Sequence, residues 1–347
     1  MPWTKTFYWH PLDRDRVQCD VCPRECTLHE GQRGLCFVRM NHGGEVALTT
    51  YGRTSGICID PIEKKPLNHF FPGSSVLSFG TAGCNLTCKF CQNWDISKSR
   101  DGDRLAEEAT PEMIATTARA RGCKSVAYTY NDPVIFLEYA IDTAQACHEL
   151  GIKSVAVTAG YMNEKPREEF FRSMDAANVD LKSFSERFYH AVCGGHVQPV
   201  LDTLLYVKNE TRVWLEITTL LIPDANDSEK ELEELTQWIA TNLGVDVPMH
   251  FTAFHPDWKM ITTPRTPVAT LRKARDIAQR NGIRYVYTGN VFDPRGQSTY
   301  CHRCHACLID RSGYAIRGWS LDADGCCMNC HTRCAGFFDP SGIRNYK

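Results

Sequence analysis

The sequence has little net charge and no long apolar run. Its 39 Lys and Arg residues nearly balance 41 Asp and Glu residues, leaving a formal net charge of −2. Such a chain has no overall field that would attract nucleic acid or an anionic membrane. No segment reaches the roughly 18 apolar residues that a membrane-spanning helix needs, and the beginning of the chain shows no apolar stretch typical of a signal peptide. We therefore expect a cytoplasmic protein with no membrane partner.

Internal repeats and low-complexity linkers are also missing from the sequence. This excludes solenoid and propeller architectures, which depend on repeated units. The 347 residues, 43% of them hydrophobic and 23% charged, have the composition of an ordinary globular protein and can bury a large core. Length alone predicts one large domain with appendages, or two domains.

Cysteine is the residue that the sequence has in excess. In a small secreted chain, 18 cysteines would indicate disulfides. In a large chain expected in the reducing cytoplasm, clustered cysteines instead favour metal or redox chemistry. Four isolated cysteines, Cys58, Cys123, Cys147 and Cys193, are interpreted as ordinary small side chains. The others form three groups: Cys19, Cys22, Cys26 and Cys36; Cys84, Cys88 and Cys91; and Cys301, Cys304, Cys307, Cys326, Cys327, Cys330 and Cys334.

The middle of the chain alternates apolar stretches with amphipathic ones. Thr110 and Pro111 have the residue types of a helix N-cap and first turn, and Gly151 is placed to stop a later helix. Alternation of this kind predicts an α/β fold with a parallel sheet, either doubly wound or a barrel, in which ligands bind at the carboxyl ends of the strands. We expect strands over 75–80, 124–130, 153–161, 178–184, 212–222, 248–254 and 283–291, and helices over 111–122, 133–150, 228–243 and 266–282.

The cysteine triplet Cys84, Cys88 and Cys91 directly follows the first of these strands. Three thiolates within eight residues can each bind one iron of a 4Fe-4S cluster, whereas most electron-transfer clusters have four thiolates. The fourth iron would then keep an open position for a substrate or cofactor, as catalytic zinc does. The alternatives are three ligands of a zinc site, or a chance run in a cysteine-rich chain.

The triplet, with Phe90 as its aromatic residue, resembles the motif of the radical S-adenosylmethionine (radical SAM) superfamily. The chain as a whole resembles the radical SAM enzymes of the AmmeMemoRadiSam system, which are related to pyruvate formate-lyase activating enzyme. Eight segments carry this resemblance: 19–39, 83–97, 127–140, 157–162, 180–184, 220–228, 250–260 and 286–291.

The resemblance implies a partial (β/α)6-type barrel over 71–295, with a cysteine-rich N-terminal lobe over 1–70 and a zinc-ribbon-like C-terminal domain over 296–347. It also implies that the open iron binds S-adenosyl-L-methionine (SAM). Reductive cleavage of SAM, with an electron from an external donor, would form a 5′-deoxyadenosyl radical that abstracts hydrogen from a substrate. That substrate is unidentified: a small molecule, a peptide or a nucleic-acid base. A Memo-type protein and a companion protein of the same system are the implied partners.

Several residues beyond the triplet are candidates for the active site. Many members of the superfamily bind the SAM amino group where this chain has Tyr130, Asn131 and Asp132; the alternative is that these residues only turn the chain into a helix. The related sequences usually have Glu in place of Asp132. Asp180 and Lys182 point to the same face of a strand, and in activating enzymes this pair lies near SAM; the alternative is an internal ion pair.

One further segment is implied to lie by the adenine of SAM. It contains His250, Phe254 and His255, whose aromatic faces could stack on the base. A histidine at a strand end is also a common structural hydrogen-bonding residue, and that alternative stays open.

The two terminal cysteine groups predict further metal sites. Cys301 with Cys304, and Cys327 with Cys330, form two C-x-x-C pairs spaced as in a zinc ribbon, although the spare thiols nearby leave an auxiliary iron–sulfur cluster open. The N-terminal group of Cys19, Cys22, Cys26 and Cys36 fits zinc or a second cluster equally well.

Three functions therefore compete. The first is a radical SAM enzyme acting on an unidentified substrate. The second is an activating enzyme for a glycyl-radical enzyme. The third is a non-enzymatic metal-binding or electron-relay module.

Overall fold

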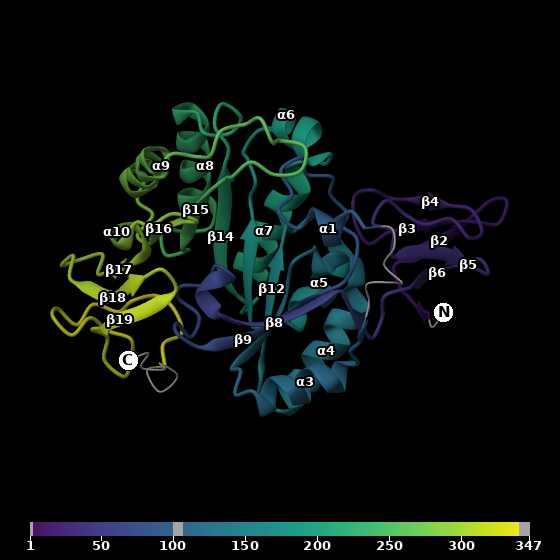
Figure 1. The fold of residues 1–347 in the computed structure, drawn as a ribbon, viewed down its shortest axis with the longest axis horizontal. Helices are drawn as coiled ribbons and strands as arrows, with labels where there is room; N and C mark the ends of the chain where they lie inside the picture. Colours follow the sequence, from purple (N-terminus) through teal and green to yellow (C-terminus); the bar gives the residue numbers. More distant parts are fainter. Residues whose placement is uncertain (1–2, 100–106, 340–347) are drawn as a thin grey trace.

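A computed structural model describes residues 3–99 and 107–339. Its centre is one eight-stranded sheet in the order β16-β15-β14-β13-β12-β11-β9-β8. Seven of these strands are parallel, and only β8 runs antiparallel, against β9. Within the described ranges the edge strands β8 and β16 do not pair, so the sheet curls into a barrel that is open between them (Figure 1). The strands are β8 (Gly56–Pro61), β9 (Ser75–Gly80), β11 (Ser125–Tyr128), β12 (Lys153–Thr158), β13 (Ala176–Asp180), β14 (Trp214–Leu221), β15 (Met249–Ala253) and β16 (Val286–Gly289).

Helices connect the parallel strands. The Thr110 side chain accepts a hydrogen bond from the Met113 N–H and so caps α3, while the Ser228 side chain caps α8 in the same way. The predicted helix over 133–150 begins as a 3-10 turn before it becomes α4, and α5 and α7 add two helices that the sequence analysis did not assign. These elements are α3 (Pro111–Ala120), η2 (Pro133–Phe136), α4 (Leu137–Glu149), α5 (Glu164–Arg172), α6 (Glu186–Phe188), the π-helix η3 (Tyr189–Cys193), α7 (Gln198–Glu210), α8 (Glu229–Asn242) and α9 (Val268–Arg280).

Apolar strands and the inner faces of the helices build the main core, in which residues such as Phe79, Tyr139 and Phe251 are fully buried. The predicted α/β class and partial barrel are confirmed, and all seven predicted strands are present. None of the helices in the described ranges combines the length and apolar character needed to cross a bilayer.

Small antiparallel sheets flank the barrel on opposite sides (Figure 1). The N-terminal region contributes β1 (Thr4–Lys5), β2 (Trp9–Leu12), β3 (Arg16–Cys19), β4 (Thr27–Leu28), β5 (Arg39–His42) and β6 (Glu45–Leu48), while β7 (Arg53–Thr54) pairs with β10 (Glu107–Glu108). The C-terminal region contributes β17 (Thr299–Tyr300), β18 (Cys307–Ser312) and β19 (Ala315–Trp319). Two short helices, α1 (Trp94–Ser97) and α10 (Pro294–Gln297), lie at the edges of the barrel.

The segment after β8 closes the barrel at the amino ends of its strands. It begins with the 3-10 helix η1 (Ile62–Lys64) and continues to Phe70. Phe70 pairs with Phe337, so this closing segment is also attached to the C-terminal region. The division into 1–70, 71–295 and 296–347 stays a prediction, and residues 1–2 and 340–347 of its outer units lie outside the described residues. β8 and η1 precede position 71 yet belong to the wall and floor of the barrel.

Candidate active site

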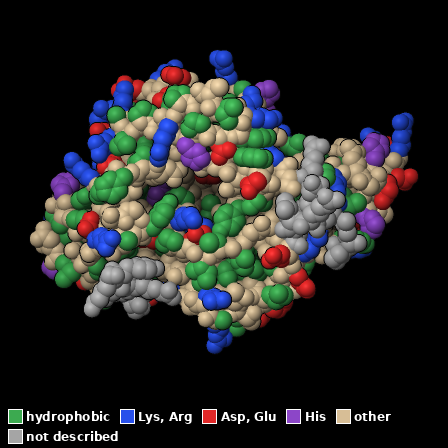
Figure 2. All heavy atoms as spheres, viewed as in Figure 1, with side chains coloured by type: hydrophobic (Ala, Val, Ile, Leu, Met, Phe, Trp, Pro, Cys, Tyr) green, Lys and Arg blue, Asp and Glu red, His purple; other side chains and the backbone are tan. Residues whose placement is uncertain are grey.

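A cavity of about 270 Å³ lies at the carboxyl ends of the parallel strands. The loop after β9, the ends of the next five strands and the residue after β16 all contribute to its wall, as expected for a parallel α/β barrel. The face of the molecule seen in Figure 2 is hollowed near its centre, where basic and acidic side chains lie close together. The predicted site residues that line the cavity are Cys84, Cys88, Phe90, Cys91, Tyr130, Asn131, Asp132, Asp180 and Lys182.

The loop that carries the cysteine triplet is clamped by backbone hydrogen bonds to the π-helix η3. The Thr87 N–H donates to the Cys193 carbonyl at 2.8 Å, and the Lys89 N–H donates to the Val192 carbonyl at 2.9 Å. Burial raises the pKa of the Cys84 thiol to about 12, while a hydrogen bond with Cys193 lowers the pKa of Cys88 to about 7.

Asn131 holds the start of this loop. Its side-chain oxygen accepts from the Thr81 N–H at 3.1 Å, and its amide nitrogen donates to the Gly83 carbonyl at 3.0 Å. Gly80, at the end of β9, has to be glycine because a Cβ there would lie 2.3 Å from the Thr129 carbonyl oxygen and 2.7 Å from the Asn131 side-chain oxygen. Strand end and loop are thus packed backbone against backbone.

Asp132 is engaged in local structure. Its carboxylate accepts hydrogen bonds from Thr158 Oγ1 at 2.8 Å, the Val134 N–H at 3.1 Å and the Ala159 N–H at 2.9 Å. It caps η2, as the structural alternative for this segment predicted, and burial raises its pKa. Tyr130 occupies the left-handed region with φ 70°, which is costly for a residue with a side chain. A cofactor contact by Tyr130, Asn131 or Asp132 stays a prediction.

Asp180 and Lys182 form an ion pair at the cavity wall. Lys182 Nζ lies 3.0 Å from Asp180 Oδ2 and 5.9 Å from the centre of the Phe90 ring. Burial by itself would lower the pKa of Lys182, but the neighbouring Asp180 and Cys88 raise it well above its usual value. Lys182 therefore keeps a positive charge beside the triplet, whereas the Asp180 side chain is 37% exposed and in reach of solvent.

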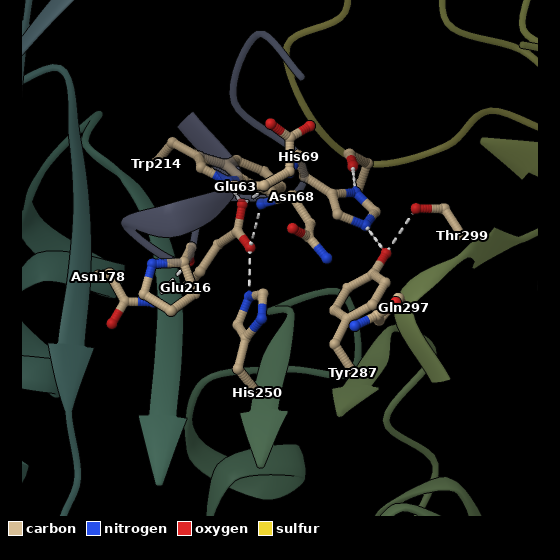
Figure 3. Close-up of polar contacts among 12 residues, drawn as sticks. Glu63, Asn68, His69, Asn178, Trp214, Glu216, His250, Tyr287, Gln297 and Thr299 are labelled. Atoms are coloured by element: carbon tan, nitrogen blue, oxygen red, sulfur yellow. Dashed lines mark hydrogen bonds and ion pairs between the residues drawn. The ribbon is translucent and has the colours of Figure 1, made fainter. Parts of the chain in front are cut away.

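The structure does not bring His250, Phe254 or His255 to the cavity. Phe254 is fully buried, and His255 is exposed, with Nδ1 3.4 Å from the neighbouring Pro256 carbonyl. His250 lies near the amino end of β15, where Nε2 is 2.7 Å from Glu216 Oε2 and the ring stacks on Tyr287. Figure 3 shows the side chains of His250, Glu216 and Tyr287 converging below the closing segment. The observed position of His250 matches the structural alternative, because Glu216 already engages it.

The C-terminal C-x-x-C pairs form a compact cage. The sulfur atoms of Cys301, Cys304, Cys327 and Cys330 all lie within 4.8 Å of one another, with distances of 3.6 Å for Cys301–Cys330 and for Cys304–Cys327. Four sulfurs bound 2.3 Å from a single zinc ion lie about 3.8 Å apart. This donor set therefore fits a tetrahedral metal ion.

The four N-terminal cysteines surround a second, separate cavity. Cys19 and Cys36 are buried, and Cys22 and Cys26 are partly exposed. In the described part of the chain, only the C-terminal group brings three or more possible metal ligands within 4.8 Å of one another. The N-terminal cysteines and the triplet both lack that compact geometry.

The sequence analysis assigned no role to several residues that line the cavity. Lys98 and Thr252 line the cavity, as do Thr218 and Asn290, and the buried Thr218 hydroxyl has no hydrogen-bond partner in the described structure. The signal for Thr252 was present, because it lies on the same face of a predicted strand as the candidate His250. Lys98 carried no such signal, since it lies beyond the triplet in a loop.

The residues of the main cavity fit an iron–sulfur cluster with an additional ligand. Three thiols line the wall together with two lysines, which offset the negative charge of metal-bound thiolates. No histidine and no fourth cysteine is among the described lining residues, so the protein offers three sulfur ligands. The unpartnered Thr218 hydroxyl gives a bound molecule a polar contact.

Comparisons with known proteins agree with this chemistry. The family model of the radical SAM superfamily matches residues 79–238. Uncharacterized protein MJ0808 of Methanocaldococcus jannaschii is 38% identical over 320 residues, which cover 92% of this chain and 95% of that protein. A pyruvate formate-lyase-activating enzyme of Clostridium pasteurianum is 28% identical over 160 residues, covering 45% of this chain and 66% of that enzyme.

Solved structures support the fold. A radical SAM methyltransferase from Sphaerobacter thermophilus superposes with a TM-score of 0.51 at 16% identity, covering 63% of this chain and 67% of that one. The cysteine triplet at the carboxyl ends of an open parallel barrel agrees with these matches. The chain is an enzyme of the radical SAM superfamily and is related to the pyruvate formate-lyase-activating enzymes.

Proposed function

We propose that Cys84, Cys88 and Cys91 hold a 4Fe-4S cluster with one open iron, and that SAM binds to this iron inside the cavity. The observation that carries the proposal is the composition of the cavity wall. It presents three thiols and two lysines, while Cys193 lies behind Cys88 and outside the wall. When bound, cluster and SAM together supply the 5′-deoxyadenosyl radical that removes a hydrogen atom from an unidentified substrate.

The residues of the chain bind, orient and shield these groups. Asn131 fixes the start of the cysteine loop, and the charge of Lys182 lies beside Cys88 and over Phe90. We assign Lys182 the role of offsetting thiolate charge and of binding an anionic group of SAM, with Asp180 as the residue that positions it.

The size of the cavity bears on the substrate. About 270 Å³ is at the lower end for a single small-molecule site, which is typically about 300–1,000 Å³. Because the cluster and SAM have to share this space, the substrate has to approach from the open side of the barrel. This favours a substrate of which only one part enters, such as a peptide or a larger molecule.

We place the enzyme in the AmmeMemoRadiSam system, with a Memo-type protein and its companion as partners. The support is the set of eight segments quoted from the sequence, which extends over nearly the whole chain. The division into a barrel over 71–295 and cysteine-rich units over 1–70 and 296–347 belongs to this assignment. Copurification of the chain with the two companion proteins tests it.

Activation of a glycyl-radical enzyme is the second candidate function. It is favoured by the 28% identity to the activating enzyme of Clostridium pasteurianum, although that match covers 45% of this chain. Mixing the reduced, SAM-loaded protein with candidate glycyl-radical enzymes should then produce an oxygen-labile radical signal. No signal with any candidate would exclude this function for the tested set.

A purely non-enzymatic relay module is disfavoured by membership of an enzyme superfamily.

The proposed cluster and SAM site are tested by anaerobic reconstitution with iron and sulfide. The protein is then reduced in the presence of SAM, and 5′-deoxyadenosine is measured. The triple variant Cys84→Ala/Cys88→Ala/Cys91→Ala should abolish the product. Two matched controls, the exposed Cys58→Ala and the buried Cys193→Ala, should keep it. Product from the triple variant, or loss of iron in Cys193→Ala, would refute the three-ligand site.

A further inference from the structure

The two terminal cysteine groups differ in the spread of their sulfur atoms. The C-terminal four meet within 4.8 Å, whereas no three of the N-terminal four do so in the described structure. A single metal ion draws its four ligands together, while a cluster binds each thiolate to a different iron and keeps the sulfurs apart. The sulfur atoms of the triplet in the main cavity likewise do not all lie within 4.8 Å of one another in the described structure. In sulfur spacing, the N-terminal group resembles the cluster site and differs from the zinc-like cage.

The N-terminal cysteines are nevertheless arranged around one space. Cys19, Cys22, Cys26 and Cys36 all line the same cavity, which is otherwise walled mainly by apolar groups such as Val21 and Ile135. The four side chains are held by different pieces of backbone: the Cys19 N–H donates to the Cys26 carbonyl at 3.0 Å, and Cys36 lies on the next turn of the chain. The arrangement leaves a shielded interior between the sulfurs.

Two arginines adjoin this space. Arg39 is buried and lines it, with a bidentate pair to Glu138 and a hydrogen bond from Nε to the Ile135 carbonyl at 2.9 Å. Arg24 also lines it, but its buried Nη2, which has no partner in the described structure, lies towards Gly194, and its guanidinium lies over the Tyr161 ring. The Arg39 guanidinium acts electrostatically on Cys19 and Cys36, and there it would offset the negative charge of a metal–thiolate centre. This argument supports any thiolate-bound metal; the sulfur spacing favours a cluster.

The cavity directly adjoins the triplet loop. Asn85, the residue after Cys84, lines the N-terminal cavity, and its carbonyl accepts from Arg24 Nε at 2.9 Å. Gly83, the residue before Cys84, packs on the Cys36 carbonyl so closely that a Cβ at this position would lie 2.0 Å from that oxygen. Both neighbours of Cys84 thus contact the N-terminal cysteine region.

We propose that Cys19, Cys22, Cys26 and Cys36 hold a second 4Fe-4S cluster that passes electrons to the cluster of the triplet. Four thiolates cap all four irons, so this cluster transfers electrons and does not bind substrate. An external one-electron donor reduces it from the 2+ to the 1+ state, and it returns to 2+ when the electron moves to the triplet cluster. Cys22 and Cys26 are partly exposed, so this cluster would lie close to the surface that a donor protein contacts. The relay step rests on the proposed function of the triplet; the cluster itself does not.

Metal content of the triple variant Cys84→Ala/Cys88→Ala/Cys91→Ala, purified anaerobically as the full chain, tests the cluster. We expect about four iron atoms and one zinc ion per chain, with the electron paramagnetic resonance signal of a reduced 4Fe-4S cluster, and about eight iron atoms in the wild type. Two zinc ions and no iron in the triple variant would overturn the proposal. This result does not depend on SAM cleavage, so it stays informative if the proposed function fails.

The relay is tested by Cys26→Ala, with circular dichroism and thermal unfolding to show that the variant folds. SAM cleavage driven by a reduced flavodoxin- or ferredoxin-type donor protein should fall at least tenfold, while cleavage driven by dithionite, which reduces the triplet cluster directly, should stay within twofold of wild type. Unchanged rates with the protein donor, in a variant that has lost the second cluster, would overturn the relay. If Cys26→Ala does not fold, freeze-quenched reduction of the wild type by the donor protein replaces it: the relay requires the second cluster to be reduced first.

Discussion

Buried polar groups lie at both ends of the barrel interior, but the two ends differ in how completely these groups are hydrogen-bonded. At the amino end, the buried Glu216 carboxylate accepts four hydrogen bonds: from the backbone N–H groups of Asn68 and His69, from Trp214 Nε1, and from His250 (Figure 3). Two residues further along the same strand, Thr218 lines the cavity, and its buried hydroxyl has no partner in the described structure. A carboxylate with four donors is held rigidly, whereas an unpartnered hydroxyl that lines a cavity is able to bond to a ligand. The barrel is sealed at one end and prepared for binding at the other.

The largest effect should come from breaking the sealed end. Glu216→Ala leaves buried donors without an acceptor, and we expect the free energy of unfolding to fall by about 3–5 kcal/mol. Denaturant unfolding measures this loss. The exposed Glu234→Ala, which removes only a surface pair with Lys230, should change stability by less than about 0.5 kcal/mol. Equal losses in both variants would show that the network is not special.

At the prepared end, a substitution should affect activity more than stability. Lys182→Met keeps apolar packing over Phe90 but removes the charge, and Asp180 can be hydrated because it is partly exposed. We expect SAM cleavage to fall on the order of 100-fold, with a stability change below about 1 kcal/mol. The exposed Lys208→Met serves as the control. A Lys182→Met variant with wild-type turnover would remove this residue from the site.

The sealed end should also respond to acid. Burial lowers the pKa of His69 from 6.5 to about 4, so the unfolded chain takes up this proton at a higher pH than the folded protein does. The contribution to stability is therefore complete above about pH 6.5 and is lost as the pH falls from there through 4. It amounts to about 3 kcal/mol. Unfolding curves from pH 7 to 4 should show a smaller loss in His69→Gln than in the wild type; parallel losses would contradict the assignment.

The smallest effect compares two neighbouring threonines on opposite faces of β14. Thr218→Val removes a hydroxyl with no partner, so stability should change by less than about 1 kcal/mol while SAM binds several-fold more weakly. Thr219 Oγ1 donates to the Leu181 carbonyl at 2.7 Å, so Thr219→Val should cost about 1–2 kcal/mol and leave SAM binding unchanged. Isothermal titration with SAM, combined with denaturant unfolding, measures both. The reverse pattern would mean that the ligand does not reach Thr218.

The sequence revealed much of the barrel because apolar runs flanked by turn residues carry the strand signal. β8 was not predicted, since Ile57, Cys58 and Ile59 are exposed on an edge strand and show no inward-outward alternation. The π-helix η3, which clamps the cysteine loop, depends on tertiary contacts that no local pattern encodes. The loop motif, in contrast, could be found because its chemistry is confined to eight residues.

His250 illustrates the limit of strand reasoning. Alternation shows which residues share a face, but not how deep along the strand each one lies. β15 ends at Ala253, three residues beyond His250, and a rise of roughly 3.3 Å per residue places His250 about 10 Å below the strand end. A histidine expected beside a cofactor therefore lies in the floor. Thr252, one residue from the end, is the cavity residue of this strand.

The closing segment has a consequence for any shortened version of this enzyme. Its His69 bonds to the carbonyl of Ala335 through Nδ1 and to the Tyr287 hydroxyl through Nε2, while Arg311 of β18 donates to the Asn68 carbonyl. The closing segment at the floor of the barrel is thus held in place by residues of the C-terminal region. A fragment trimmed to the parallel strands and their helices would lose the closing segment and leave Glu216 facing water. The C-terminal region is therefore a structural part of the catalytic unit, and a shortened enzyme has to keep it together with the closing segment.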